Sequence, residues 1–130
     1  GEACMKAIEK SGKKVVLISS NSLSHRHFVT EAPLPEDMSR EHIYNHSQYV
    51  WDMKIIDMFR KGQMQEVVDI MPEYTEQTIA ETEAGGLIWM MAAMGVPSYP
   101  AEIYGYQSVI GTGNCIACWD PNTNTRELVL

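Results

Sequence analysis

His25 is the side chain of this sequence best suited to proton transfer, because an imidazole titrates nearer to neutral pH than other side chains. Four apolar residues at positions 15–18 lead into the polar stretch 19–24 and then into His25. This order predicts a buried strand whose carboxyl end enters a loop. Ligands of open α/β sheets bind beyond such strand ends. We therefore expect His25 at a ligand site; a helix cap, or a partner for loop carbonyls, is the alternative for the same position.

Glu81 and Glu83 are a second candidate, since they stand directly before the apolar run 87–94. That run is nearly all apolar and predicts a buried helix. A carboxylate where such a helix begins can face an interior cavity, and a buried negative charge needs a partner such as a metal ion. In the alternative, both acids lie in solvent and are stabilised by the helix dipole. The residues alone leave both interpretations open.

Two further pairs have spacings that occur in metal or redox sites. His42 and His46 stand four apart, which can place two imidazoles on one metal ion, but no adjoining acid or third ligand accompanies them. We expect surface or interface histidines. Cys115 and Cys118 have the spacing of a redox or zinc half-site, yet they fall in a predicted strand, where residues three apart face opposite sides. Two ordinary buried thiols are expected, with a thiol redox module as the alternative.

Helices are predicted from the periodicity of apolar residues and from Gly and Pro signals. A long helix has Ser39 as its N-cap, ends at Lys61 before Gly62, and presents one apolar face. The residues of that face are Tyr44, Trp51, Ile55, Met58 and Phe59. Other helices are predicted at residues 1–10, from Pro72 as a first residue onward, and at 87–94.

Two strands are predicted near the end of the chain, at residues 101–110 and 115–119, joined across the glycine-rich turn 111–114. Glycines also stand at positions 85 and 86, where the missing side chains would let another backbone approach the buried helix closely.

Composition excludes several kinds of partner. The chain has 130 residues, 45% of them hydrophobic, and a formal net charge of −7. These values suit one globular domain, and an acidic chain without basic runs argues against nucleic acid and anionic membranes. No apolar stretch reaches the ~20 residues that cross a bilayer. Three cysteines do not form a disulfide framework, so a cytoplasmic protein is expected.

Four features, taken in order, resemble the class III (LigB-type) extradiol ring-cleavage dioxygenases. They are Asn21-Ser22-Leu23-Ser24-His25-Arg26, Met71-Pro72-Glu73-Tyr74, Glu81 and Gly111-Thr112-Gly113. The second is similar to the Leu-Pro-Glu-Tyr of bacterial homoprotocatechuate-cleaving members, and Glu81 falls where the family places its iron-binding glutamate. The likeness covers residues 15–119 and is closest to members that cleave 2-aminophenol.

The resemblance implies a mononuclear Fe(II) held by two histidines and one glutamate. Glu81 would be the carboxylate ligand. His25 would not bind iron but would accept a proton from the substrate and later donate one. The two histidine ligands belong to the family's N-terminal half, and His27, His42 and His46 do not match their motifs. Residues 1–130 are therefore expected to be the C-terminal portion of one catalytic domain, inactive without the N-terminal portion.

Substrate, fold and partners also follow from the resemblance. The reaction would insert both atoms of O2 into 2-aminophenol or a related catechol, giving 2-aminomuconate semialdehyde or an analogue. Thr112 and Asn114 would bind ring substituents, with a plain hairpin turn as the alternative, and Tyr104 and Tyr106 would line the pocket or pack in the core.

The implied fold is α/β, a three-layer α/β/α arrangement around a central mixed sheet. The implied partner is a homologous second subunit in a heterotetramer. In an alternative, this chain is itself the non-catalytic structural partner, but the presence of both His25 and Glu81 argues against that.

Overall fold

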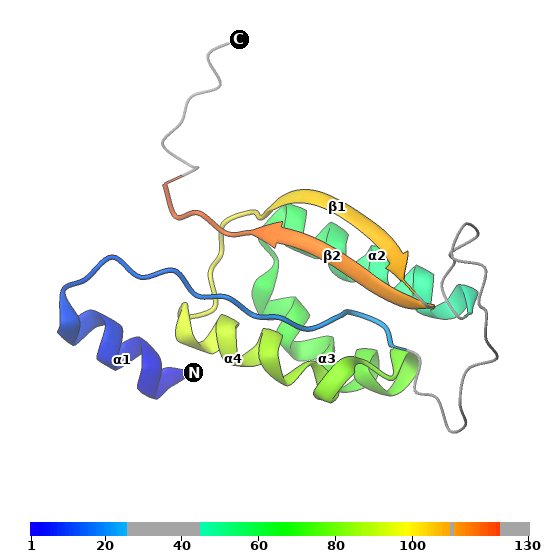
Figure 1. Cartoon of the computed structure of the whole chain (residues 1–130), viewed down its shortest axis with the longest axis horizontal. Helices are drawn as coiled ribbons and strands as arrows, with labels where there is room; N and C mark the ends of the chain where they lie inside the picture. The colour runs from blue at the N-terminus through cyan, green and yellow to red at the C-terminus, as the bar shows by residue number, and fades with distance from the viewer. Residues whose placement is uncertain (26–44, 110, 123–130) are drawn as a thin grey trace, which may run out of the picture.

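The computed structural model describes residues 1–25, 45–109 and 111–122 (Figure 1). The expectations for Arg26, His27, Ser39, His42 and Tyr44 lie outside the described residues. The elements, in chain order, are α1 (Glu2–Ser11), α2 (His46–Lys61), α3 (Met64–Thr78), the 3-10 helix η2 (Glu81–Ala84), α4 (Gly85–Ala93), β1 (Glu102–Val109) and β2 (Thr112–Cys118).

The helices form a layer on one side of the β1–β2 hairpin, and residues 13–25 run as extended chain beside β2 (Figure 1). Helix α2 contacts both strands and packs on α3, while α1 contacts α4. The core between them is apolar and includes Ile55, Met64, Val67 and Met91, each with no exposed surface. Each such side chain stabilises the fold by roughly 1.5–3 kcal/mol. Within the described ranges, none of the helices has both the length and the apolar character needed to cross a membrane.

The long helix α2 has clear local signals at both ends. The side chain of Asn45 accepts a hydrogen bond from the amide of Gln48 at 2.9 Å and so caps the first turn. At the other end Gly62 takes a left-handed φ of 70°, as predicted. Among the described residues the helix therefore begins after Asn45, and the cap predicted at Ser39 lies outside them.

The prediction that Pro72 begins a helix is wrong. Pro72 lies inside α3, which runs unbroken from Met64 to Thr78. Proline removes one backbone donor and crowds the preceding turn. The helix persists because its buried face, with Val67, Met71 and Tyr74, packs on the core, while Pro72 itself is exposed.

The predicted buried strand at residues 15–18 is also not found. The segment is extended but belongs to no sheet; the described sheet consists of β1 and β2 alone. Val16 is 85% exposed and Ile18 is 79% exposed. Backbone pairing with β2 occurs only farther on, where Leu23 N donates to Gly113 O at 2.8 Å and Gly113 N donates to Ser24 O at 3.0 Å. Helices with a small antiparallel sheet are compatible with the α/β class.

The connection between β1 and β2 is shorter than the predicted turn at residues 111–114. Strand β2 already begins at Thr112, which pairs with Val109, so Thr112, Gly113 and Asn114 are strand residues and not a turn. Gly111 supplies the left-handed backbone of the connection, with a φ of 74°. The two strands therefore bring the glycine-rich motif against residues 22–25.

Gly113 is required for this close approach, and replacing it tests the fold. A Cβ at this position would lie 2.6 Å from the Tyr106 hydroxyl and 2.7 Å from Ser24 Oγ, and closer still to an Asp52 carboxylate oxygen. We expect Gly113→Ala to lower the free energy of unfolding by about 1–3 kcal/mol, measured by urea denaturation. Gly105→Ala is the matched control, because nothing lies within 4 Å of that Cβ position. Equal effects of the two substitutions would contradict this explanation.

Candidate active site

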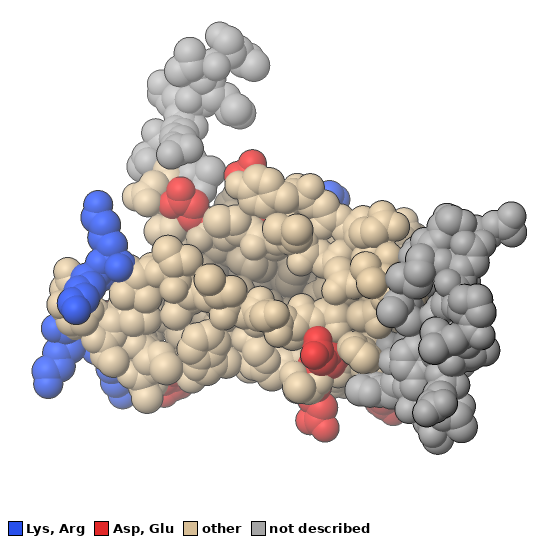
Figure 2. Space-filling model, viewed as in Figure 1, with Lys and Arg blue, Asp and Glu red and all other residues tan. Residues whose placement is uncertain are grey.

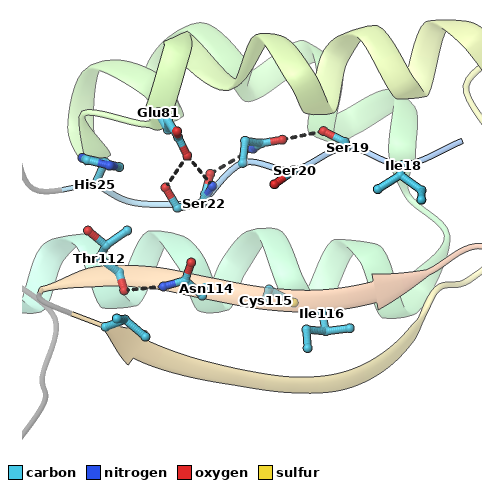
Figure 3. A pocket seen from close by; sticks show the side chains of 12 residues that line it. Ile18, Ser19, Ser20, Ser22, His25, Glu81, Thr112, Asn114, Cys115 and Ile116 are labelled. Atoms are coloured by element: carbon cyan, nitrogen blue, oxygen red, sulfur yellow. Dashed lines mark hydrogen bonds between the residues drawn. The ribbon is translucent and has the colours of Figure 1, made fainter.

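A cavity of about 710 Å³ lies between residues 18–25, the start of η2 and strand β2 (Figure 3). Its lining includes His25, Glu81, Thr112 and Asn114, so the structure brings all four sequence-predicted site residues to one place. The volume is typical of a small-molecule site. Figure 2 shows that Lys and Arg side chains gather at the end of the molecule formed by α1, while the surface beside the extended segment is mostly uncharged.

Glu81 points toward the loop that carries His25 and does not lie in open solvent (Figure 3). Its Oε2 accepts hydrogen bonds from Ser22 N at 2.8 Å and from Ser22 Oγ at 2.9 Å. The interpretation of Glu81 as a solvated first-turn acid is therefore wrong. Glu83, in contrast, is exposed to solvent and is absent from the cavity lining.

The backbone that carries Glu81 is strained. Ile79, Thr82, Glu83 and Ala84 all have φ between 50° and 56°, in the left-handed region. Side chains with a Cβ pay about 1–3 kcal/mol for such conformations, which persist where the surroundings enforce them and which cluster at functional sites. The strained residues flank Glu81 on both sides, so the chain departs from regular helix at the point where this carboxylate enters the cavity wall.

Gly86 lets α4 approach the loop side of the cavity. A Cβ there would lie 2.8 Å from both Ser19 Oγ and Asn21 Oδ1, whereas one on Gly85 would meet nothing closer than 3.9 Å. The predicted approach of another backbone is thus not found; the close approach occurs at Gly86 alone and is made by side chains of the extended segment.

The backbone of His25 is held from two sides. Its amide donates to Thr78 O at 3.1 Å, and its carbonyl accepts from Gln48 Nε2 at 3.1 Å. The same Gln48 amide group also donates to Thr78 O at 2.9 Å. Gln48 and Thr78 have no exposed surface, so these hydrogen bonds are buried. A buried hydrogen bond is electrostatically stronger than one in water.

Behind His25 lies a buried acid that sequence reasoning missed, Asp52 on α2. Its Oδ1 accepts from Ser24 N at 3.0 Å and from the Tyr74 hydroxyl at 2.8 Å. Its Oδ2 accepts from Ser24 Oγ at 2.6 Å and from the Tyr106 hydroxyl at 2.5 Å. The signal was present in the sequence: Asp52 shares a helical face with the core residues Ile55, Ile56 and Phe59.

Burial controls the protonation of this cluster. Desolvation raises the pKa of Asp52, and the hydrogen bonds from Ser24, Tyr106 and Tyr74 oppose that shift. Desolvation also raises the pKa of both Tyr74 and Tyr106, and the neighbouring carboxylate adds to the effect. Both phenols therefore stay protonated at neutral pH and remain hydrogen-bond donors to Asp52.

Comparison with known proteins gives the family. Residues 1–116 match the family described as the catalytic LigB subunit of aromatic ring-opening dioxygenase. The chain belongs to the LigB family. It is 48% identical over 120 residues to the 2-aminophenol 1,6-dioxygenase beta subunit of a Pseudomonas species, covering 92% of this chain and 39% of the relative. It is 27% identical over 104 residues to the 3,4-dihydroxyphenylacetate 2,3-dioxygenase of Escherichia coli, covering 80% of this chain and 37% of the relative.

This LigB-family chain thus spans about two-fifths of the length of both relatives. In the part of the chain that the structure describes, no cluster of three or more His, Cys, Asp or Glu side chains is placed to hold a metal ion. Glu81 fits one position of a metal site, because its carboxylate reaches the cavity wall and is oriented by Ser22. A complete ligand set would need donors outside the described residues.

The other candidate pairs of this LigB-family chain do not form sites among the described residues. His46 is exposed at the first residue of α2 and stacks on Tyr49 at 6.2 Å between ring centroids, while His42 lies outside them. Cys115 is half-buried, and burial raises the pKa of its thiol. Cys118 is exposed, so the prediction of two buried thiols is wrong for it.

Tyr104 and Tyr106 of β1 lie in different environments. Tyr104 is 63% exposed, and its hydroxyl donates to Glu102 Oε2 at 2.8 Å. The register shifts between Ile103 and Gly105, which leaves Tyr104 without a partner on β2. Tyr106 turns inward to Asp52, and neither ring lines the cavity. Tyr106 thus supports the buried polar cluster rather than the pocket wall.

Proposed function

We propose that this chain is the C-terminal portion of an Fe(II)-dependent extradiol dioxygenase domain. The reaction inserts both atoms of O2 into 2-aminophenol or a related catechol and gives 2-aminomuconate semialdehyde or an analogue. The observation that carries the proposal is the convergence of His25 and Glu81 on one cavity, although they lie far apart in the sequence. The family membership and the 2-aminophenol 1,6-dioxygenase beta subunit as a relative support the reaction and the substrate class.

In this proposal Glu81 is one metal ligand, and Ser22 orients it through two hydrogen bonds to Oε2. Two histidines from the N-terminal portion complete the set, in keeping with the incomplete donor set of the described residues. When bound, Fe(II) supplies the centre at which an aromatic substrate with adjacent oxygen and nitrogen, or two oxygens, meets O2.

His25 performs the proton transfers. As a base it accepts the proton that the substrate hydroxyl releases on binding, and as an acid it returns a proton when the O–O bond breaks. A side chain that works in both directions needs a proton affinity suited to neutral pH, which an imidazole has. The clamp on its backbone from Thr78 and Gln48 keeps the ring at the cavity wall through both steps.

Thr112 and Asn114 face the substrate from strand β2. Both line the cavity opposite the loop of His25, and the Asn114 side-chain amide donates to Thr112 O at 3.0 Å. That bond fixes the orientation of the Asn114 amide. Its carbonyl oxygen and the Thr112 hydroxyl are then suited to hydrogen-bond an amino or hydroxyl group on the ring.

The exposed apolar side chains of Val16 and Ile18 support the placement of this chain within a larger domain. An extended, apolar and unpaired segment beside a strand is the edge on which further strands add. With such strands a three-layer α/β/α fold around a mixed sheet would form. The partner in this proposal is a homologous second subunit in a heterotetramer. The relative is a beta subunit, which supports the presence of a further subunit.

The test uses the complete polypeptide of which this chain is a portion, with and without its partner subunit. It is loaded anaerobically with Fe(II), mixed with 2-aminophenol and exposed to air, and the absorbance of a ring-opened product is followed. We expect product and about one iron per active polypeptide. Absence of product with 2-aminophenol and with every catechol tried would refute the catalytic proposal. Iron found only in the partner would favour a structural role for this chain.

A further inference from the structure

We propose that Asp52 is a positioning residue for His25 and acts through Ser24. This inference rests on the proposed function, because it assumes that His25 transfers protons. Asp52 does not line the cavity, so it has no direct route to a substrate. It binds instead the residue that directly precedes His25.

The carboxylate of Asp52 is surrounded by donors alone. Each of its oxygens accepts two hydrogen bonds, from one backbone amide and three hydroxyls of Ser24, Tyr74 and Tyr106. An ionised carboxylate has about four lone-pair sites and no proton, so it satisfies all four donors at once. A protonated acid would have to donate one of these bonds to a hydroxyl. The four hydrogen bonds therefore favour the anion, whereas burial disfavours it and raises the pKa of Asp52.

That cost argues for a role other than stability. Asp52 has no exposed surface, and a buried charge is expensive even when it is fully hydrogen-bonded. Apolar side chains of similar volume often stabilise a core as well or better. What the carboxylate adds is geometry: both donors of Ser24, its amide and its hydroxyl, are tied to one point on a rigid helix.

Two side chains of α2, one helical turn apart, form hydrogen bonds to the loop that carries His25. Gln48 holds the carbonyl of His25, and Asp52 holds the amide and hydroxyl of Ser24. Residues four apart lie on the same helical face, so both side chains reach the loop together. The peptide group that follows His25 and the one that precedes Ser24 are thus both fixed to α2.

The Asp52 carboxylate also contacts both strands of the hairpin, which lies opposite the His25 loop. Tyr106 reaches it from β1, and Gly113 of β2 passes so close that no Cβ would fit. Gly113 in turn pairs with Leu23 and Ser24. Asp52 therefore holds the His25 loop in place against β2, and misplacement of a reacting group by about 1 Å can cost about 100-fold in rate.

The test is Asp52→Asn in the complete, Fe(II)-loaded enzyme, with Asp57→Asn as the matched control. Asp57 lies on the same helix, is exposed and pairs with Lys61. We expect Asp52→Asn to lower kcat by about 10- to 100-fold, with KM and iron content changed by less than about twofold. Asp57→Asn is expected to leave all three unchanged. No fall in kcat would overturn the inference.

A double-mutant cycle separates positioning from general destabilisation. If Asp52 acts through His25, Asp52→Asn should lower kcat no further in a His25→Ala background. An equal loss in both backgrounds would overturn the inference and leave the proposed function intact. Full activity of His25→Ala alone would instead remove the proposed function.

Where Asp52→Asn fails to fold, Tyr106→Phe takes its place, because it removes only one of the four donors. The same lack of additivity with His25→Ala is expected, with a smaller loss in kcat. Additive losses in this pair would also overturn the inference.

Discussion

Replacing His25 by Ala in the complete enzyme should lower kcat by about 10²- to 10⁴-fold, the range expected when a general acid–base group is removed. Iron content should stay near that of the wild type, because His25 is proposed to move protons and not to bind metal. Its backbone bonds to Thr78 and Gln48 do not involve the imidazole, so the substitution should leave the loop in place. Steady-state kinetics and metal analysis on the same preparation measure both quantities.

The control for this substitution is His46→Ala, which removes an exposed imidazole at the start of α2. It should leave kcat and iron content unchanged. Addition of free imidazole should restore part of the activity of His25→Ala, because His25 lines an open cavity that a small base can enter. Loss of iron in proportion to the loss of rate would identify His25 as a ligand and contradict its role in proton transfer.

Elements with local signals could be predicted from the sequence. The left-handed Gly62 ends α2 as predicted, and the helices predicted at residues 1–10 and 87–94 are found as α1 and α4. These signals act within a few residues and need no distant partner. The prediction for Pro72 was wrong because it used local preference alone. Proline prefers the first turn of a helix, but here the packing of the buried α3 face outweighs that preference.

Features that depend on distant contacts could not be predicted. Burial of residues 15–18 needs neighbouring strands, and among the described residues none pairs with them. The choice between the two interpretations of Glu81 depended on Ser22, which stands far earlier in the sequence. Asp52 was overlooked because its role depends on hydrogen-bond donors from three other parts of the chain. Without those donors, the sequence shows only one polar residue on an apolar helical face.

Glu81→Gln should weaken iron binding by more than about 100-fold, since loss even of a group that only orients a metal ligand costs about 10- to 100-fold. Glutamine keeps an oxygen that can accept from Ser22 but lacks the negative charge that balances a divalent cation. The fold should therefore persist, and thermal unfolding of the metal-free protein should change little. Iron titration of the complete enzyme measures the effect.

Neighbouring residues provide a graded control for this prediction. Glu83→Gln removes an exposed carboxylate two residues away and should leave iron affinity unchanged. Ser22→Ala removes one of the two donors to Glu81 and should weaken iron binding by about 10-fold, the lower end of the range for orienting groups, because the Ser22 amide remains. Equal effects of the Glu81 and Glu83 substitutions would mean that net charge, and not a specific ligand, controls metal uptake. The order Glu81, Ser22, Glu83 is expected only if the Glu81 carboxylate itself contacts the metal, because a purely electrostatic effect would not depend on the neutral Ser22 hydroxyl.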